Sequence, residues 1–550
     1  MYLHCIRLTF PDCQNRSNHF GAAITTISRK LSPYAVSRRK QVLNLLNSIQ
    51  YHAAQYPLSI ALQSVSTKNE EFALNYDELN NQIAQLSTQL FSLTAKKPVA
   101  INIDNHTAWV VIDLAALACE TVLVPLPSFF SNAQLLHSMQ NAGVVAVITD
   151  NPNRFCEVLG DLIIGQCTFN VANKILTQFM LAIPSVTLPD GTVKITYTSG
   201  TTGNPKGVCL GLEAILNVAN SIKNVVGLTK KSQHACILPL STLLENVAGV
   251  YATLLAGGTV HILPSAQVGF SGSEFDSQKL YETLAKTHAN TVILIPELLK
   301  ALVLKLESGA QALSDLQFVA VGGAHVATHF LNRAKHLGIP VFEGYGLSEC
   351  ASVVALNTSA ANKIGSVGKP LKHIELMFSQ EQEILVKGAN FLAYAQENLA
   401  QSAEWLATGD IGYVDDDGYL FINGRKKHIF ITSFGRNVSP EWVERELTSQ
   451  PAIAQACLFG EAKPWNTAVI VAQANTNIDQ IQQSIAKVNQ TLPDYARITQ
   501  FVLADTPFSV SNQQLTPNSR LKRDAIWRAY EHTINALYTE QDKDLKHGLL

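Results

Sequence analysis

The sequence of 550 residues is poor in charge and has almost no excess of either sign. Charged residues make up 15% of the chain, and 41 lysines and arginines face 43 aspartates and glutamates, for a net charge of -2. Soluble proteins usually carry about 25% charged residues. Without a basic surplus, the composition gives no support for a protein that binds nucleic acid or anionic membranes over its surface. Hydrophobic residues reach 47%, which excludes a disordered chain and predicts several large buried cores.

Paired cysteines and long hydrophobic runs are also missing. The nine cysteines are odd in number and scattered, with no C-x-x-C pair, which argues against a disulfide framework or a thiolate zinc site. This usage is typical of the reducing cytoplasm, where we expect the protein to be located. The most apolar windows are residues 107–127, which contain Asp113 and Glu120, and residues 247–264, which are interrupted by three glycines and His261, so no transmembrane helix is predicted.

The N-terminal 40 residues differ from the rest of the chain. They contain seven basic side chains and one acid, Asp12, without a sustained hydrophobic period. The first apolar stretch is short and interrupted by His4 and Arg7, which is untypical of a secretory signal. We expect residues 1–40 to form a disordered basic extension, although a transit peptide would have a similar composition.

From Leu43 onward, apolar-periodic helices alternate with short β-branched runs. Alternation of strand and helix is typical of α/β domains with largely parallel sheets. The segments that we predict as buried strands are Val99–Ile103, Val144–Ile148, Thr291–Ile295 and Phe318–Val321, and Ser277–His288 is a predicted helix between two of them.

The pattern changes near Ile411. Two short strand-like runs flank the Asp417-Gly418 turn, which predicts an antiparallel hairpin that closes the large domain. About 125 residues follow Gly424, enough for a small α+β domain. The prediction is therefore an α/β protein with residues 41–424 as a large domain of mixed, largely parallel sheets that includes a small β-rich subdomain, and residues 425–550 as a small C-terminal domain.

A loop rich in glycine and hydroxyl groups follows the predicted strand Val193–Tyr197. It reads T-S-G-T-T-G-N-P-K-G over Thr198–Gly207 and precedes a helix with one apolar face. Its backbone N–H groups, four hydroxyls and the Lys206 ammonium suit a polyphosphate, and a simple turn needs no such composition. The loop is not a Walker P-loop, because Pro205 stands where that motif has glycine and Gly207 follows the lysine.

This loop, read as Y-T-S-G-T-T-G-N-P-K-G, resembles the phosphate-loop signature of the acyl-CoA synthetases and other adenylate-forming, AMP-binding enzymes. Four further segments follow in the order of that superfamily: Gly344–Glu349 (G-Y-G-L-S-E), Trp405–Asp410 (W-L-A-T-G-D), Gly424–Lys427 leading to Phe434–Glu441, and Leu515–Arg523. The resemblance covers residues 43–538. It is nearest to the long-chain fatty acyl-CoA synthetase branch, because the L-P-L-S-T-L-L-E stretch at Leu238–Glu245 and the ending L-T-P-x-x-x-L-K-R are similar to that branch.

The resemblance implies an ATP site. Tyr345 would stack on adenine, Glu349 would hold Mg²⁺, a cation that prefers carboxylate oxygen, and Asp410 would accept both ribose hydroxyls. Lys206 and Glu349, with Arg520, are the implied catalytic residues. The other implied nucleotide-binding residues are Thr198, Ser199, Gly200, Thr201, Thr202, Gly203, Gly323, Ala324, Gly346, Ser348 and Arg425.

The resemblance also implies a mobile C-terminal domain. It would turn about Lys427 between two half-reactions, and the Phe434-Gly435 segment would then line a tunnel for the pantetheine thiol. Two positions depart from the pattern. At position 520 the superfamily has a lysine that bridges the attacking carboxylate and the α-phosphate, and this chain has arginine. The planar guanidinium of arginine is not equivalent to the compact charge of lysine. Lys522 is an alternative candidate for the bridging role. Thr242 stands where long-chain relatives have histidine or an aromatic at the entrance of the acyl pocket, so that pocket is either wider or repacked.

The implied function is ATP-dependent activation of a carboxylic acid, a long-chain fatty acid, to acyl-AMP and pyrophosphate, followed by transfer to the thiol of coenzyme A. ATP, Mg²⁺ and coenzyme A are the implied cofactors and substrates. Two alternatives stay open: the acceptor is an acyl-carrier protein, which shares the pantetheine thiol, or the chain is a catalytically weakened acyl- or nucleotide-binding relative, because of Arg520. His325 and His329 have a helical metal spacing, but the Glu of H-E-x-x-H and a third ligand are missing, so no zinc is assigned.

Overall fold

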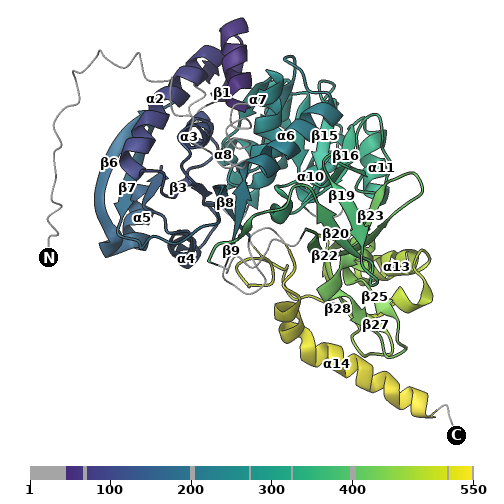
Figure 1. The fold of residues 1–550 in the computed structure, drawn as a ribbon. Helices are drawn as coiled ribbons and strands as arrows, with labels where there is room; N and C mark the ends of the chain where they lie inside the picture. Colours follow the sequence, from purple (N-terminus) through teal and green to yellow (C-terminus); the bar gives the residue numbers. More distant parts are fainter. Residues whose placement is uncertain are drawn as a thin grey trace, which may run out of the picture.

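The computed structural model describes residues 45–65, 71–198, 205–271, 274–323, 326, 328–396, 404–516 and 520–547. The predictions for residues 1–40, for Ser199–Gly203, and for Ala324 and His325 lie outside the described residues. The chain forms a large α/β body, a small antiparallel sheet and a separate C-terminal domain (Figure 1). The α/β architecture that the alternation of elements predicts is therefore confirmed.

One large sheet contains eight strands in the order β21-β9-β8-β4-β3-β5-β7-β6. The central pairs β4–β3, β3–β5 and β4–β8 are parallel, and the remaining pairs are antiparallel. The strands are β3 (Val99–Asn102), β4 (Leu123–Pro125), β5 (Ala146–Thr149), β6 (Ile163–Val171), β7 (Lys174–Leu181), β8 (Thr192–Thr198), β9 (Lys206–Gly211) and β21 (Ala393–Tyr394).

The second large sheet has nine strands in the order β18-β17-β16-β15-β14-β10-β11-β1-β2. Its six strands from β16 to β1 run parallel, so their carboxyl ends share one edge. The strands are β1 (Ile60–Val65), β2 (Glu71–Asn75), β10 (Gln233–Cys236), β11 (Thr259–Ile262), β14 (Thr291–Leu294), β15 (Phe318–Val321), β16 (Val341–Tyr345), β17 (Ala355–Leu356) and β18 (Lys369–Pro370).

The helices between the two sheets explain the high apolar content of the chain. Helix α3 (Thr107–Ala118) is buried from Thr107 to Leu117, and it shares one continuous core with both sheets, α6 (Leu212–Val226), η2 (Leu244–Tyr251, a π-helix) and α7 (Ala252–Ala256). The outer helices are a segment over residues 45–55, α2 (Tyr76–Thr94), α4 (Asn132–Ala142), α5 (Pro152–Leu159), α8 (Ser265–Val268), α9 (Ser277–Thr287), α10 (Pro296–Glu307) and α11 (Thr328–His336), with a short hairpin of β12 (Phe270–Ser271) and β13 (Glu274–Phe275).

The predicted hairpin after Ile411 is present as β22 (Leu406–Val414) and β23 (Leu420–Arg425). It belongs to a four-stranded antiparallel sheet with β19 (Glu375–Phe378) and β20 (Glu383–Lys387). This sheet is the predicted β-rich subdomain. Because β23 ends at Arg425, it leads directly into the C-terminal domain.

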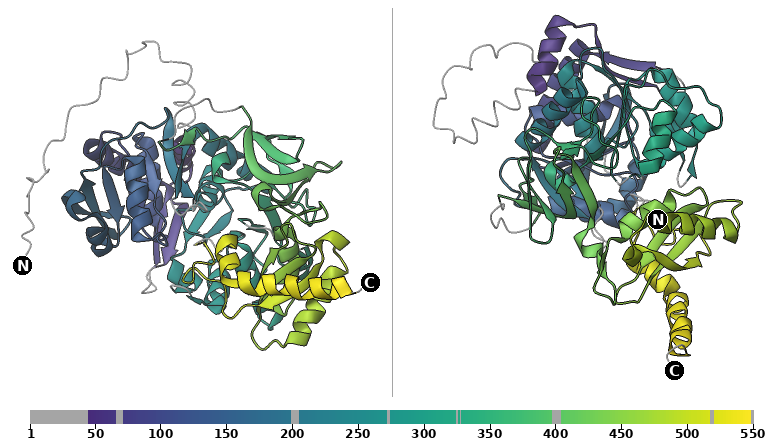
Figure 2. Two further views of the ribbon diagram at one scale, coloured as in Figure 1. Left: turned by 90° about the horizontal axis from the view of Figure 1, so that it is seen from below. Right: turned by 90° about the vertical axis from the view of Figure 1, so that its right-hand side faces the viewer.

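The C-terminal domain has hydrophobic cores of its own. A three-stranded sheet of β26 (Ile453–Phe459), β27 (Asn466–Ala472) and β28 (Ile498–Leu503) packs on α12 (Pro440–Thr448), α13 (Ile478–Asn489) and α14 (Arg523–His547), and β24 (Phe430–Ile431) pairs with β25 (Asn437–Val438). The end of α14 extends away from the molecule (Figure 2). Ile526, Tyr530, Ile534 and Tyr538, spaced four residues apart, are its buried face.

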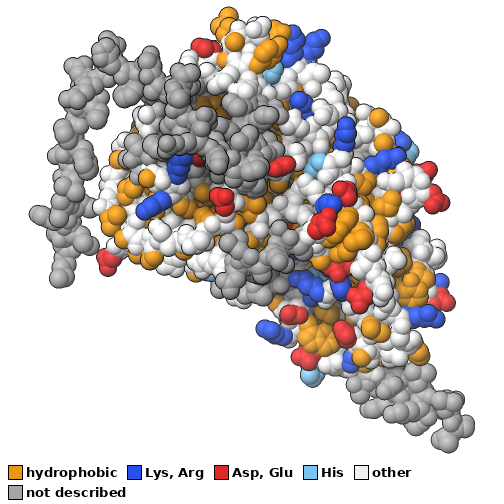
Figure 3. Space-filling model, in the orientation of Figure 1, with side chains coloured by type: hydrophobic (Ala, Val, Ile, Leu, Met, Phe, Trp, Pro, Cys, Tyr) orange, Lys and Arg blue, Asp and Glu red, His pale blue; other side chains and the backbone are white. Residues whose placement is uncertain are grey.

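The surface agrees with the balanced composition. Acidic and basic side chains are interspersed on the face that Figure 3 shows, without a large area of one sign. Among the described helices, none combines the length and apolar character needed to cross a bilayer.

Candidate active site

The site lies at the carboxyl ends of β15 and β16, where the nine-stranded sheet faces the β22–β23 hairpin. Parallel strands of an open α/β sheet place their following loops together at this edge, which is where such sheets bind ligands. Gly322 and Gly323 follow β15, Tyr345 ends β16, and Gly346 follows it. A Cβ atom at Gly346 would lie 1.6 Å from the carbonyl oxygen of Ser352, so the tight turn after β16 requires glycine.

A buried carboxylate connects β16 to the hairpin. The Tyr345 hydroxyl donates to Asp410 Oδ2 at 2.6 Å, and Arg425 Nε lies 2.7 Å from Asp410 Oδ1. Asp410 is 4% exposed, and burial raises the pKa of its carboxyl, while the positive charge of Arg425 and the hydrogen bond from Tyr345 act in the opposite direction. Each carboxylate oxygen can accept a further hydrogen bond, so Asp410 retains the capacity to accept the two hydroxyls of a ribose.

Glu349 and Lys206 both contact Tyr394. Glu349 lies in the short helix η3 (Ser348–Cys350) and is half-buried, and its Oε1 accepts from the Tyr394 hydroxyl at 2.8 Å. Lys206, the first residue of β9, places Nζ 4.9 Å from the centre of the Tyr394 ring. Glu349 is the carboxylate that the sequence assigns to Mg²⁺, and its second oxygen suits such a hard cation. Within the described chain there is no group of three or more His, Cys, Asp or Glu arranged to hold a metal ion by itself, so Mg²⁺ would be shared with phosphate oxygens, its usual mode of binding.

Arg520 reaches this edge from the C-terminal domain. Its Nη2 donates to the Gly323 carbonyl at 3.4 Å, and its positive charge acts on Asp410. The backbone around it is closed by hydrogen bonds between Thr516 and Arg520 and by a bridge from Leu515 to Leu521. Arg520 therefore lies beside Gly323 and lines the cavity that is described next, whereas Lys522 does not line it.

An apolar cavity of ≈ 230 Å³ opens from Arg520 and Gly323 into the body of the large domain. Its walls come from α6, β14, β15 and the segment around η2, and Thr242 and Ser348 are among the residues that line it. The Thr242 hydroxyl is bound to the carbonyl of Pro239 at 2.6 Å, which turns it away from ligands. The lining is mainly apolar, and half of its residues are alanine, valine, leucine or isoleucine, as expected for the hydrophobic part of an organic acid.

Two family models match this chain. An AMP-binding enzyme model covers residues 49–389, and a model of the AMP-binding enzyme C-terminal domain covers residues 427–542. The chain is an AMP-binding enzyme. It thus belongs to the adenylate-forming superfamily that its five sequence segments resemble.

Curated relatives of this AMP-binding enzyme are ligases of coenzyme A. The long-chain-fatty-acid–CoA ligase FadD15 of Mycobacterium bovis is 26% identical over 84% of this chain and 92% of its own length. The 2-succinylbenzoate–CoA ligase of Bacillus subtilis is 26% identical over 74% of this chain and 85% of its own. The solved structure of o-succinylbenzoate coenzyme A synthetase (MenE) from Bacillus subtilis, in complex with ATP and magnesium ion, has a TM-score of 0.68 at 22% identity and covers 87% of this chain and 98% of that chain.

The structure brings most of the predicted site residues of the AMP-binding enzyme to one edge. Thr198 ends β8 and Lys206 begins β9, and these two strands pair antiparallel across the phosphate loop. The sequence pattern did not predict β9, because it suggested that the loop leads straight into α6. Beside Lys206, the Pro205 carbonyl lies 3.2 Å from His137 Nε2, within hydrogen-bond distance.

Two predicted residues of the AMP-binding enzyme lie away from the cavity. Gly435 occupies an exposed turn between β24 and β25 with a φ of 70°, and it is not among the residues that line the cavity. Lys427 lies in the exposed turn η4 (Lys426–His428), directly after β23. In this arrangement the C-terminal domain presents Arg520, and not Gly435, to the site.

Tyr394 is the site residue that sequence reasoning missed. Its position depends on the pairing of β21 with β9, which joins residues about 185 positions apart in sequence (Ala393 with Cys209, Tyr394 with Val208). The local sequence around Tyr394 does not predict this pairing, because β21 is only two residues long.

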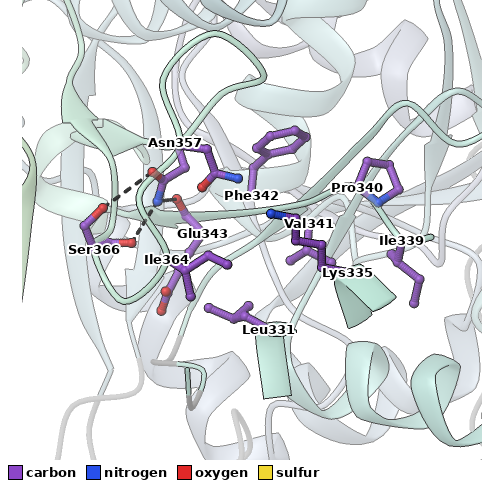
Figure 4. A pocket seen from close by; sticks show the side chains of 11 residues that line it. Leu331, Lys335, Ile339, Pro340, Val341, Phe342, Glu343, Asn357, Ile364 and Ser366 are labelled. Carbon is purple, nitrogen blue, oxygen red and sulfur yellow. Dashed lines mark hydrogen bonds between the residues drawn. The ribbon is translucent and has the colours of Figure 1, made fainter. Parts of the chain in front are cut away.

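A smaller cavity of ≈ 180 Å³ lies on the outer side of β16 (Figure 4). Asn357 Nδ2 donates to the carbonyls of Ser366 at 2.7 Å and Glu343 at 3.2 Å, and Glu343 Oε1 accepts from the backbone N–H of Val326. These hydrogen bonds connect β16 to the neighbouring segments, so they help to fix the position of Tyr345 at the end of this strand.

Proposed function

We propose that this AMP-binding enzyme activates a long-chain fatty acid with ATP, forming acyl-AMP and pyrophosphate, and then transfers the acyl group to coenzyme A. The observation that carries the proposal is the position of Arg520 at the junction of the apolar cavity and the Tyr345–Asp410–Arg425 cluster. An acid in the cavity would present its carboxylate at the edge where a nucleotide would present its α-phosphate. This is the arrangement that an attack of carboxylate on phosphorus needs.

In the first half-reaction, a carboxylate oxygen forms a bond to the α-phosphorus and the bond from that phosphorus to pyrophosphate breaks. Both reactants are anions, so the protein must offset their charge. Arg520 would hold the carboxylate against the α-phosphate, and Lys206 would hold the outgoing phosphates, while Asp410 fixes the ribose. Mg²⁺ bound at Glu349 would neutralise phosphate charge. No covalent bond to the protein is required.

In the second half-reaction, a thiol sulfur forms a bond to the acyl carbon, AMP leaves with the former carboxylate oxygen, and the thiol proton passes to solvent. Arg520 has no part in this step. We propose that the C-terminal domain turns about Lys427, which withdraws Arg520 and brings the turn at Gly435 to the site. The exposed position of Lys427 directly after β23 supports it as the hinge.

The choice of a fatty acid rests on the lining of the cavity and on one group of relatives. The walls are mainly apolar, and Thr242 leaves the entrance without a large side chain. FadD15, named as a long-chain-fatty-acid–CoA ligase, aligns with 84% of the chain. The other relatives, named as ligases of 2-succinylbenzoate, make an aryl acid the competing substrate.

Exchange of labelled pyrophosphate into ATP tests the first half-reaction alone. Palmitate, octanoate and benzoate are offered separately to the wild type and to Lys206→Ala. We expect palmitate to support the fastest exchange, and the variant to lose most of it. If only benzoate supports the exchange of pyrophosphate, the substrate is an aryl acid and not a fatty acid. If the protein binds ATP but none of the acids supports exchange, it is a binding protein and not an enzyme.

The acceptor is tested separately by adding coenzyme A or a phosphopantetheinylated acyl-carrier protein to enzyme that has formed acyl-AMP. We expect thioester with coenzyme A. Thioester with the carrier protein alone would assign the enzyme to acyl-carrier loading.

A further inference from the structure

Four buried polar side chains, which we call the Asp113 cluster, lie inside the large domain, and neither proposed half-reaction uses them. The cluster consists of Asp113 from α3, Lys194 from β8, and Asn246 and Tyr251 from the π-helix η2. None of the four is more than 1% exposed. Burying an ion pair costs the desolvation of two charges, and apolar side chains of similar volume often give equal or greater stability. Stability is therefore a weak explanation for this cluster.

Asp113 is the centre of the cluster. Its Oδ1 lies 2.8 Å from Lys194 Nζ. Its Oδ2 accepts from Asn246 Nδ2 and from the Tyr251 hydroxyl, both at 2.8 Å. Lys194 Nζ also donates to Asn246 Oδ1 and, at 3.2 Å, to the Tyr251 hydroxyl oxygen. Each of the four side chains thus contacts at least two others, so the cluster fixes α3, β8 and η2 relative to one another.

The π-helix η2 allows two of its residues to reach the same carboxylate oxygen. Asn246 and Tyr251 are five residues apart, and in an α-helix they would point about 140° apart. The wider i→i+5 turn of a π-helix brings such residues to one side, and π-turns occur frequently at functional sites. Leu244 and Ala248 of the same helix line the apolar cavity. Helix η2 therefore contacts Asp113 with one part of its surface and forms a wall of the cavity with another.

Lys194 connects the cluster to the strand beside the phosphate loop. It lies in β8, whose last residue, Thr198, pairs with Lys206 of β9. Lys194 and Thr198 are four residues apart, so they share one face of the strand. A shift of β8 against η2 would move Lys206, which is proposed to hold the outgoing phosphates, relative to an acid bound in the cavity. Misplacement of reacting groups by about 1 Å can slow a reaction by about a hundredfold.

We infer that Lys194 and Asp113 are positioning residues for adenylation: their ion pair holds β8, and with it Lys206, in a fixed position relative to the wall of the acid-binding cavity. This inference rests on the proposed function and adds to it two residues that act without touching a substrate. In the proposed second half-reaction, the phosphates that Lys206 holds have already left as pyrophosphate. The cluster should therefore affect the first half-reaction and not the second.

The double variant Lys194→Met/Asp113→Leu tests the inference, because it removes both charges together and leaves neither of them buried without its partner. Two rates are measured on one preparation: exchange of labelled pyrophosphate into ATP with palmitate, and thioester formation from added palmitoyl-AMP and coenzyme A. We expect exchange to fall by about ten- to hundredfold and thioester formation to stay within about threefold of the wild type. A loss of folded protein lowers both rates by the same factor, so the ratio of exchange to thioester formation reports positioning and not stability. An unchanged ratio in the double variant overturns the inference.

A matched pair of tyrosine variants makes the result independent of whether the double variant folds. Tyr251 and Tyr76 are both 0% exposed, and each hydroxyl donates one hydrogen bond of 2.8 Å, to Asp113 in the first case and to the Gly258 carbonyl in the second. Tyr251→Phe should lower the ratio by about two- to tenfold, the range that one hydrogen bond supplies, whereas Tyr76→Phe should leave it unchanged. Equal ratios in these two variants overturn the inference and leave the proposed activity in place. Exchange by the wild type with none of the offered acids would instead overturn the proposed function.

Discussion

At the scale of single residues, the polar side chains of the site are oriented by hydrogen bonds and ion pairs with one another, independently of a ligand. Asp410 is engaged on both oxygens by Tyr345 and Arg425. Groups that are already oriented need little reorganisation when charge develops near them, and such preorganisation is the main source of electrostatic catalysis. The roles of Asp410 and Arg520 can therefore be separated by substitution.

Arg520→Ala should slow adenylation by about 10²- to 10³-fold, the usual effect of removing one group that stabilises charge in the transition state. Arg520→Lys keeps the charge and should retain more activity than the alanine variant. Pyrophosphate exchange measures both. Thioester formation from added acyl-AMP should be little affected, and equal losses in both half-reactions would show that Arg520 is only structural.

Lys522→Ala is the matched control, because Lys522 is near Arg520 in sequence but does not line the cavity. A larger loss of exchange in Lys522→Ala than in Arg520→Ala would identify Lys522 as the adenylating cation.

Asp410→Asn should weaken ATP binding by about ten- to hundredfold, since a charge-assisted acceptor becomes a neutral one and Arg425 loses its ionic partner. Equilibrium titration with ATP measures the dissociation constant. Tyr345→Phe removes the hydrogen bond to Asp410 but keeps the ring, so we expect a smaller loss. An unchanged ATP affinity in Asp410→Asn would remove this residue from the nucleotide site.

At the scale of elements, the segment that carries Arg520 depends on a buried ion pair between two helices of the C-terminal domain. Arg523, the first residue of α14, places Nη1 2.6 Å from Glu444 Oε1 and Nη2 2.5 Å from Glu444 Oε2, and Glu444 lies in α12. Glu444 Oε1 also accepts from the backbone N–H of Leu458 at 2.6 Å. Bidentate geometry and this third contact fix the start of α14, three residues after Arg520.

Glu444→Gln should destabilise the C-terminal domain by up to about 3–5 kcal/mol, because the buried Arg523 loses its bidentate partner and keeps only the longer contact of Nη2 with Glu441 Oε1 at 3.7 Å. Thermal unfolding monitored for the C-terminal transition measures this effect. Glu446→Gln, two residues away on α12, affects a partly exposed pair with Arg445 and should cost less than about 1 kcal/mol. Similar melting temperatures for the two variants would contradict a structural role for the Glu444–Arg523 pair.

Features with a local cause could be predicted from the sequence at this scale. The strand Phe318–Val321 is present with the predicted bounds, and Thr291–Ile295 is one residue longer than β14, because β-branched and aromatic runs between helices specify buried strands directly. Features that arise from pairing between distant segments could not be predicted. β9 exists because it pairs with β8, and Tyr394 reaches Glu349 because β21 pairs with β9.

At the scale of the whole molecule, buried histidines make stability depend on pH. His261 lies in β11 within the second large sheet and is 9% exposed; its Nε2 lies 2.7 Å from Gln233 Oε1. Burial, with the charges of neighbouring His234 and His288, lowers the pKa of His261 to about 4. Above pH 6.5 both folded and unfolded chains keep this residue neutral. Between pH 6.5 and about 4 the unfolded chain takes up a proton that the folded chain refuses, so acidification favours unfolding.

His261→Asn should therefore reduce the loss of stability between pH 7 and pH 5, by up to about 2 kcal/mol. Melting temperatures of wild type and variant at the two pH values measure the difference. His532→Gln is the control, because the His532 side chain is exposed on α14 of the C-terminal domain and does not act on His261. An equal pH dependence in wild type and His261→Asn would show that other groups control the acid sensitivity.

The arrangement of the two domains corresponds to the first of the two proposed half-reactions. Arg520 contacts Gly323, while the turn at Gly435 is exposed and does not line the cavity. Under the proposed mechanism, the C-terminal domain turns before the thioester forms, and the backbone between β23 and β24 would absorb that movement. Lys427 stands in this connection, where the N–H of Ile429 donates to the carbonyl of Arg425 at 3.1 Å.

Lys427→Pro should separate the half-reactions, because proline fixes φ at its own position and restricts the residue before it. We expect pyrophosphate exchange within about tenfold of the wild type, and thioester formation from acyl-AMP and coenzyme A lowered by at least about a hundredfold. Lys427→Ala removes the charge but leaves the backbone free, so it should retain both. If Lys427→Pro loses exchange and thioester formation together, the substitution has disturbed the site and not the movement; if it loses neither, the domain turns elsewhere.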